Sequence, residues 1–145
     1  MLTQKLLIGT SCLLLALSFA LHAGAEQERA VIKTNVGDII ISLYSENAPF
    51  TVSHFKKHVV DKVYDNAGFY RVVSGQYIQG GAGYARGHQR KRINEEFSIK
   101  NKNIRGAVGF ARQILDDPDS GTTEFYILLS DYPSMDDYTY TVFGG

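Results

Sequence analysis

Residues 68–81, GFYRVVSGQYIQGG, place two short aromatic and β-branched runs on either side of a serine–glycine pair. Such runs around turn residues predict two strands joined by a tight turn. Arg71 carries the only charge of the stretch, and Gln79 stands just before a glycine pair. The stretch has no cysteine, histidine or carboxylate. The Arg71 guanidinium and the Gln79 amide, in a largely apolar lining, are therefore the groups to which any chemistry here is assigned.

The segments before this stretch predict a hairpin and a helix. Residues 31–33 and 38–44 flank the turn residues 34–37, and the second arm alternates so that one face is aliphatic. Pro49 then opens a predicted helix, at a position where a missing N–H costs nothing. Apolar residues at three- and four-residue spacing predict one buried stripe on this helix. They are Val52, Phe55, Val59 and Val63.

The rest of the chain predicts short strands separated by loops rich in Gly, Asp and Asn. These strands cover residues 69–73, 77–79, 107–111, 125–129 and 140–143. Many short strands, few helices and many aromatic residues are typical of a closed or nearly closed antiparallel β-barrel. The fold class is therefore predicted to be mainly β, with one helix capping the barrel.

The first 25 residues predict a cleaved secretory signal. Lys5 gives a short positive start, residues 6–21 are apolar, and Ala23 and Ala25 are small residues at the positions that a signal peptidase reads. A retained membrane anchor is the alternative, although the apolar run is shorter than the roughly 20 residues of a usual span. The mature chain, residues 26–145, would be one periplasmic or secreted domain. The only cysteine, Cys12, leaves with the signal, so no disulfide is expected.

The charge balance excludes a general attraction to nucleic acid or to anionic membranes. The chain has 15 Lys and Arg against 15 Asp and Glu. Three local clusters are interpreted as solvated surface. They are the His54–His58 pair on the predicted helix, the basic run RGHQRKR at residues 86–92, and the acidic turn DDPDSG at residues 116–121. A metal at the histidines, an acidic client or lipid headgroup at the basic run, and calcium at the acidic turn remain as alternatives.

Several blocks, in order, resemble the cyclophilin family of peptidyl-prolyl cis-trans isomerases. The stretch FYRVVSGQYIQGG is similar to the family's Phe-His-Arg-aliphatic-aliphatic-Pro-Gly-Phe-Met-x-Gln-Gly-Gly. The blocks VIKTNVGDIIISLYSENAPFTVSHF, RGAVGFAR, SGTTEFYILLSD and YTVFGG are similar to its first hairpin and helix and to three later strands. The resemblance covers residues 30–144 and is strongest to the exported bacterial branch.

The resemblance implies an enzyme that accelerates rotation about X–Pro bonds in unfolded or extended exported proteins, and so assists their folding. It implies no cofactor, no metal, proline-containing polypeptides as partners, no nucleic acid, no membrane contact after signal cleavage, and a monomer. Arg71 would donate to the prolyl nitrogen, and Gln79 would hold the substrate backbone. By register, the implied substrate-binding residues are Gln76, Tyr77, Ala111, Arg112, Gln113, Glu124, Phe125, Tyr126, Met135 and Tyr140.

Two departures from the family pattern bear on activity. Gln76 and Tyr77 stand where the family has Phe-Met, so one wall of the proline pocket becomes polar. Glu124 stands where the family has Gln, and its carboxylate is expected to pair with Arg71 and draw the guanidinium from the substrate. These changes favour altered turnover over a new reaction. A module that binds proline segments or acts as a chaperone with little catalysis is the alternative function.

The end of the chain is the largest departure. The family continues past Val-Phe-Gly with a second helix and a closing strand beside the first strand, whereas this sequence ends at Gly145. The domain is therefore expected to be incomplete at its C-terminal side, with the edge of the first hairpin unpaired. A fragment that cannot fold alone is the third possibility.

Overall fold

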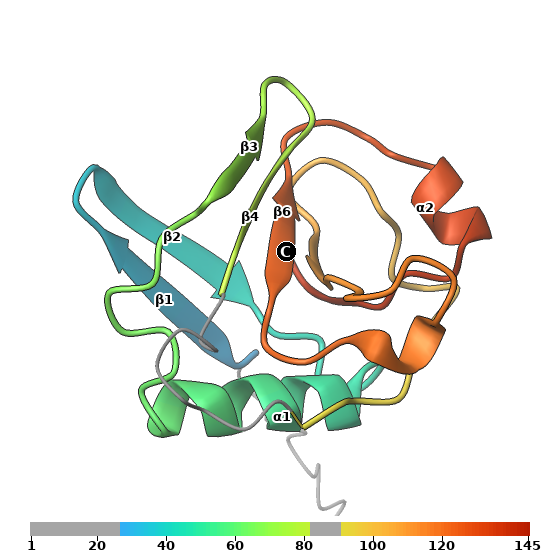
Figure 1. The fold of residues 1–145 in the computed structure, drawn as a ribbon, viewed down its shortest axis with the longest axis horizontal. Coiled ribbons are helices and arrows are strands. Elements are labelled where there is room, and N and C mark those ends of the chain that lie inside the picture. Colours follow the sequence, from blue (N-terminus) through green and yellow to red (C-terminus); the bar gives the residue numbers. More distant parts are fainter. Residues whose placement is uncertain (1–26, 82–90) are drawn as a thin grey trace, which may run out of the picture.

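The computed structural model describes residues 27–81 and 91–145, and the expected signal segment lies outside these ranges. In chain order the strands and α-helices are β1 (Arg29–Thr34), β2 (Gly37–Ser42), α1 (Pro49–Val60), β3 (Arg71–Val73), β4 (Tyr77–Gly80), β5 (Val108–Phe110), β6 (Phe125–Leu128), α2 (Ser134–Asp137) and β7 (Val142–Gly144). A single 3-10 turn at Pro118–Ser120 precedes β6. The predicted hairpin, helix and later strands are all present, and the mainly β class is confirmed (Figure 1).

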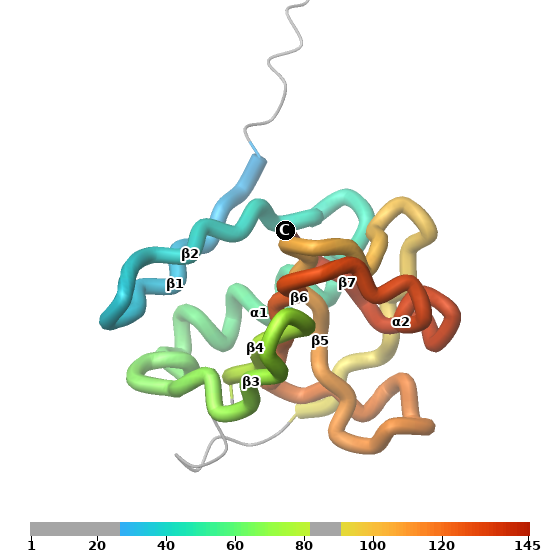
Figure 2. Tube along the Cα trace, turned by 90° about the horizontal axis from the view of Figure 1, so that it is seen from above, coloured from blue at the N-terminus to red at the C-terminus, as the bar shows by residue number. Residues whose placement is uncertain are grey.

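The strands form two antiparallel sheets that meet at one point. β1 pairs with β2, and the second sheet has the order β3-β4-β6-β5-β7. A bridge between Leu43 and Gly144 and two backbone hydrogen bonds between Ser42 and Gly145 join the end of β2 to the end of β7. The strands therefore follow one another from β1 around to β3, and the tube trace shows the hairpin standing beside the second sheet (Figure 2).

Alternation along β6 divides the second sheet into two faces. Phe125 and Ile127 point to the main core, where they pack with α1 and the first hairpin. Tyr126 and Leu128 point to the other face and form a second, smaller cluster with residues of the C-terminal segment. The main core includes Ile41, Leu43, Val52, Phe55, Val108, Phe110 and Phe143.

Helix α1 begins at Pro49, as predicted, but its cap comes from far along the chain. Ala48 at the cap position offers no side-chain hydrogen bond. The Glu96 carboxylate instead accepts from the amides of Phe50 and Thr51, at 3.1 and 2.8 Å. A carboxylate at this end also interacts favourably with the helix dipole. No spacing rule within the helix indicates a cap that is 45 residues away.

The buried face of α1 differs from the predicted stripe. Val52, Phe55 and Val63 are buried, whereas Val59 is 48% exposed and His58 is only 8% exposed. The interpretation of His54 and His58 as a solvated pair is therefore wrong. Each donates to a backbone carbonyl, His54 Nε2 to Thr122 at 2.6 Å and His58 Nδ1 to His54 at 2.8 Å. Within residues 27–81 and 91–145 no group of side chains is arranged to hold a metal.

One residue of the basic run, Arg92, contacts the acidic turn. Residues 86–90 of the run lie outside the described residues, but Arg92 pairs with Asp117 and donates through Nε to the Asp119 carbonyl at 2.9 Å. Asp119 also accepts from the Glu95 amide at 2.7 Å. The carboxylates of Asp117 and Asp119 therefore bind protein groups. No helix in the part of the chain that the structure describes is long and apolar enough to cross a membrane.

Candidate active site

The strand register sets a row of residues across the second sheet. Arg71 lies opposite Gln79, Gln79 opposite Tyr126, and Tyr126 opposite Gly109. Residues directly opposite in antiparallel strands point to the same face, so Arg71, Gln79 and Tyr126 share the face away from the main core. We call this surface the Arg71 face. The structure thus brings together the guanidinium, the amide and one of the aromatic rings that the sequence indicated.

Arg71 projects from β3 as an exposed side chain. Its guanidinium carbon lies 5.3 Å from the centre of the Tyr77 ring, within the range of a cation–π contact. Tyr77 belongs to β4, which runs back alongside β3 through the turn around Gly75. This contact places the guanidinium beside the Tyr77 ring, and Arg71 as a whole stays exposed. The expected ion pair between Arg71 and Glu124 does not occur among the described residues.

Glu124 instead binds the amide of Gln79. The Gln79 Nε2 donates to Glu124 Oε2 at 2.9 Å and to the Tyr70 hydroxyl at 2.9 Å, and that hydroxyl donates to the same carboxylate oxygen. Glu124 is 4% exposed. These hydrogen bonds satisfy a buried carboxylate. They also hold the amide that the family resemblance assigns to the substrate backbone.

Tyr126 is buried and contacts two residues, Gly109 and Asn103. Its ring lies over Gly109, where a Cβ atom would overlap both the ring and the hydroxyl. The hydroxyl donates to Asn103 Oδ1 at 2.7 Å, and Asn103 is held in turn by Asp136 at 2.8 Å. Burial raises the pKa of Tyr126, so the phenol stays protonated. Burial would also raise the pKa of Asp136, but the hydrogen bonds from Asn103 and the nearby Lys102 outweigh it and lower that pKa.

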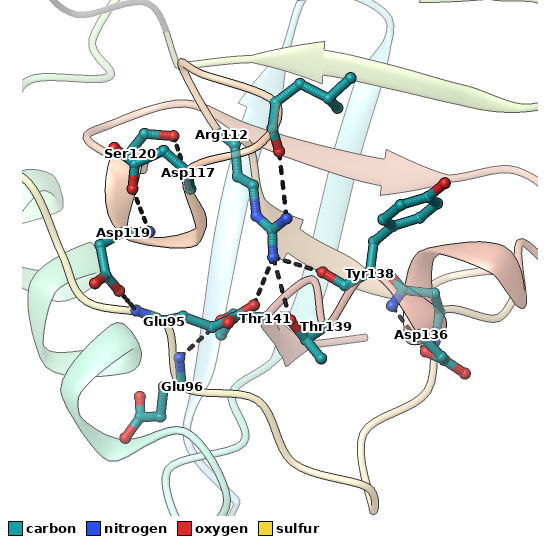
Figure 3. Close-up of polar contacts among 12 residues, drawn as sticks. Glu95, Glu96, Arg112, Asp117, Asp119, Ser120, Asp136, Tyr138, Thr139 and Thr141 are labelled. Carbon is teal, nitrogen blue, oxygen red and sulfur yellow. Dashed lines mark hydrogen bonds and ion pairs between the residues drawn. The ribbon is translucent and has the colours of Figure 1, made fainter.

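Residues of the C-terminal segment pack beside Tyr126 on the Arg71 face. Tyr140 meets Tyr126 edge-to-face with ring centres 6.1 Å apart, and Met135 packs on the same cluster. Arg112 holds this segment in place, as Figure 3 shows. Its guanidinium donates to Glu95 and to the Tyr138 carbonyl, both at 2.6 Å, and stacks 4.3 Å from the Tyr140 ring centre. The Arg112 side chain is only 9% exposed, and it links the segment that contains Glu95 to the segment that contains Tyr138.

The remaining predicted site residues are distributed differently. Ala111 is buried in the second cluster, and its amide donates to the Glu124 carbonyl, so that amide already has a partner. Gln113 is exposed in the loop after β5. Gln76 is exposed at the β3–β4 turn, where its carbonyl accepts from the Leu129 amide and its side chain accepts from the Tyr132 hydroxyl at 3.3 Å.

Phe125 does not belong to the candidate site. Its ring packs edge-to-face on Phe55, Tyr64 and Phe69 in the main core. Because neighbouring residues of a strand point to opposite faces, Phe125 and Tyr126 cannot both line one surface. The alternation was readable in the sequence. The roles of Tyr70, Asn103 and Gly109 were not, because each depends on a partner that is distant in the chain.

Comparison with known proteins gives a consistent assignment. Residues 29–145 match the family model described as cyclophilin type peptidyl-prolyl cis-trans isomerase/CLD. A peptidyl-prolyl cis-trans isomerase of Acinetobacter baylyi is 36% identical over 121 residues, which cover 78% of this chain and 63% of that protein. One of Helicobacter pylori is 34% identical over 123 residues, which cover 83% of this chain and 74% of the relative. The chain therefore spans about two thirds of the length of these relatives.

Solved structures show the same fold. The crystal structure of a cyclophilin type peptidyl-prolyl cis-trans isomerase of Cryptosporidium parvum superposes with a TM-score of 0.73 at 24% identity, covering 82% of this chain and 76% of that one. The structure of the same protein in the presence of the dipeptide Ala-Pro gives a TM-score of 0.72. The match to the family model extends over most of the sequence. This chain thus belongs to the cyclophilin-type peptidyl-prolyl cis-trans isomerase family.

Proposed function

We propose that this chain is a peptidyl-prolyl cis-trans isomerase that turns X–Pro bonds in extended polypeptides on the Arg71 face. The observation that carries the proposal is the row in which Arg71 and Gln79 lie side by side on adjacent strands, with Tyr77 and Tyr126 beside them. The family assignment and the names of the relatives support the same activity.

The chemistry needs a donor rather than a nucleophile. Rotation about a peptide bond has a barrier of about 18–20 kcal/mol, because the nitrogen shares its lone pair with the carbonyl. When the bond twists, the prolyl nitrogen regains that lone pair and can accept a hydrogen bond. Arg71 is exposed and oriented by Tyr77, so it can donate to the nitrogen in the twisted state. A fixed donor that binds the twisted state better than the planar one lowers the barrier.

The proposed substrate is a proline-containing segment of another polypeptide. One copy of the chain supplies all the groups described, and the proposal requires no cofactor, nucleic acid or membrane. The test is exchange NMR on a short Ala-Xaa-Pro peptide, with Arg71→Ala compared with the exposed Arg105→Ala as a matched control. We expect the parent and Arg105→Ala to accelerate cis–trans exchange, and Arg71→Ala to lose most of the effect. Binding of the peptide without acceleration by the folded parent would instead indicate a proline-binding module.

We propose further that the protein is exported and acts in the periplasm or outside the cell. The support is the charged start, the apolar run and the small residues before Glu26. The intact mass of the protein recovered from the periplasm or the medium tests this. A chain that begins at Glu26 is expected, and a chain retained in the membrane with residues 1–25 attached would contradict it.

A further inference from the structure

Arg112 is a buried cation that contacts the segment between α2 and β7. Its side chain is 9% exposed, and that of Glu95, its ion-pair partner, is 19% exposed. The nitrogen Nη2 that donates to Glu95 also donates to the Tyr138 carbonyl, at 2.6 Å in both cases. The guanidinium stacks on the Tyr140 ring. One side chain thus binds the residues on both sides of Thr139 (Figure 3).

Thr139 has a left-handed backbone conformation, with a φ of 57°. A β-branched residue rarely adopts this conformation, because its side chain crowds the backbone there, and it persists only where the surrounding structure holds it. Two backbone hydrogen bonds run back to α2, from the Thr139 amide to Asp136 at 3.0 Å and from the Tyr140 amide to Met135 at 3.1 Å. Arg112 adds its hydrogen bond to the preceding carbonyl and one to the Thr139 hydroxyl at 3.4 Å.

The turn at Thr139 determines where the Tyr140 ring lies. That ring is partly buried and meets Tyr126 edge-to-face, and Tyr126 lies opposite Gln79 in the strand register. Arg112 is therefore one step removed from the Arg71 face. It contacts the Tyr140 ring from inside the protein, and Tyr140 borders the face itself.

We propose that Arg112 is a positioning residue for turnover on the Arg71 face. It holds the left-handed turn at Thr139, and with it the Tyr140 ring, in the place where a proline-containing segment meets that ring. Because Arg112 is buried, it acts through Tyr140 and not by touching the substrate. The inference rests on the proposed function, since that function places the substrate on the surface that Tyr140 borders.

This arrangement predicts which kinetic constant changes when Arg112 is replaced. The Tyr140 ring offers a surface to the substrate and no donor aimed at the prolyl nitrogen, so it binds the planar and twisted states alike. Loss of an interaction that is equal in both states raises KM and leaves kcat unchanged. Partial unfolding has a different signature, because it lowers the concentration of active protein and therefore kcat, at constant KM.

The test is exchange NMR on the Ala-Xaa-Pro peptide at a series of peptide concentrations. Arg112→Lys keeps a positive charge beside Glu95 but loses the planar group that stacks on Tyr140 and binds several acceptors. We expect KM to rise about tenfold, with kcat within about twofold of the parent value. The double variant Arg112→Met/Glu95→Gln removes the ion pair without leaving a buried charge, and the same rise in KM is expected.

Arg92→Lys is the matched control. Arg92 also pairs with a carboxylate, that of Asp117, and donates to a backbone carbonyl, that of Asp119. Its recorded contacts are to this acidic turn and not to Tyr140. Both kinetic constants of Arg92→Lys should therefore equal those of the parent.

Two further variants show whether Arg112 acts through Tyr140. Tyr140→Leu removes the ring, so the addition of Arg112→Lys should raise KM no further. Thr139→Asn should rescue Arg112→Lys, because asparagine adopts the left-handed conformation more readily than threonine does. The nuclear Overhauser effects between the rings of Tyr126 and Tyr140 should weaken in Arg112→Lys and return when Thr139→Asn is added.

The outcomes separate this inference from the proposed function. Failure of the folded parent to accelerate exchange would refute the proposed function and this inference with it. Acceleration by the parent, with KM unchanged in Arg112→Lys and in Arg112→Met/Glu95→Gln, would refute this inference alone. A lower kcat at constant KM in these variants would assign Arg112 a role in stability only. An equal rise in KM in the Tyr140→Leu background would show that Arg112 does not act through Tyr140.

Discussion

Glu124 is the residue whose contacts bear most directly on turnover. It is buried, and its carboxylate accepts from the Gln79 amide and from the Tyr70 hydroxyl. A hydrogen bond to a charged acceptor is stronger than one to a neutral acceptor by about 1 kcal/mol. Gln79 is therefore held more tightly by Glu124 than it would be by an amide at that position.

The first prediction is that Glu124→Gln accelerates isomerisation. A neutral acceptor releases the Gln79 amide for the substrate backbone, and we expect kcat/KM to rise by about fivefold, the equivalent of about 1 kcal/mol. Exchange NMR on the Xaa-Pro peptide measures it, with the exposed Glu46→Gln as the control. An unchanged or lower rate in a folded Glu124→Gln protein would show that Glu124 does not restrain Gln79.

Gly109 is required by the size of its neighbour. A Cβ at this position would overlap the ring and hydroxyl of Tyr126, which is 3% exposed and bonded to Asn103. The second prediction is that Gly109→Ala lowers the free energy of unfolding by about 1–3 kcal/mol, the usual cost of overpacking. Gly68→Ala, where an added Cβ meets nothing within 4 Å, should change little. Denaturant titration of both variants measures the free energies of unfolding. Equal values for Gly109→Ala and Gly68→Ala would contradict the close packing of Tyr126 on Gly109.

At the scale of the element, α1 carries a histidine that faces inward. Burial lowers the pKa of His54 below the usual value, and His58 and Lys91 act in the same direction, whereas the hydrogen bond that His54 donates to the Thr122 carbonyl opposes them and is outweighed. A histidine with a lowered pKa in the folded state binds protons more readily when the chain is unfolded. Its contribution to stability is therefore present above about pH 6.5 and is lost as the pH falls through the folded pKa.

The third prediction is that the melting temperature falls when the pH is lowered from about 7 to about 5, the range where histidine titrates. In His54→Gln the amide can still donate to the Thr122 carbonyl but cannot titrate, so this decrease should become smaller. Calorimetry at a series of pH values measures both proteins. The same decrease in parent and variant would place the pH dependence elsewhere.

Helices and strands could be predicted where the pattern of neighbouring residues determines them. Features that depend on residues distant in the chain could not be predicted. The hairpin at β1 and β2 and the turn before Tyr77 follow from period-two patterns and turn residues, and both are confirmed. The helix was predicted, but its buried face was partly wrong, because His58 is satisfied by a backbone carbonyl and Val59 faces outward. The Glu96 cap of α1 joins residues 45 apart, so no local pattern indicates it.

At the scale of the whole molecule, the two faces of the second sheet have different surroundings. The Arg71 face lies on the side away from the main core, and the opposite face packs with α1 and the first hairpin. The resemblance placed Arg71, Gln79, Tyr77 and Tyr126 in one region, and the register agrees. It also assigned Phe125 to that region, which the alternation along β6 excludes.

The most direct measurement is amide shift mapping of the 145-residue protein with an Ala-Xaa-Pro peptide. We expect the shifts to concentrate at Arg71, Tyr77, Gln79 and Tyr126, with residues 29–33 of β1 unaffected. Line shapes at the same residues should also report exchange between the bound cis and trans forms. Shifts confined to β1 and α1, with Arg71 and Gln79 unchanged, would show that proline is not bound and turned on the Arg71 face.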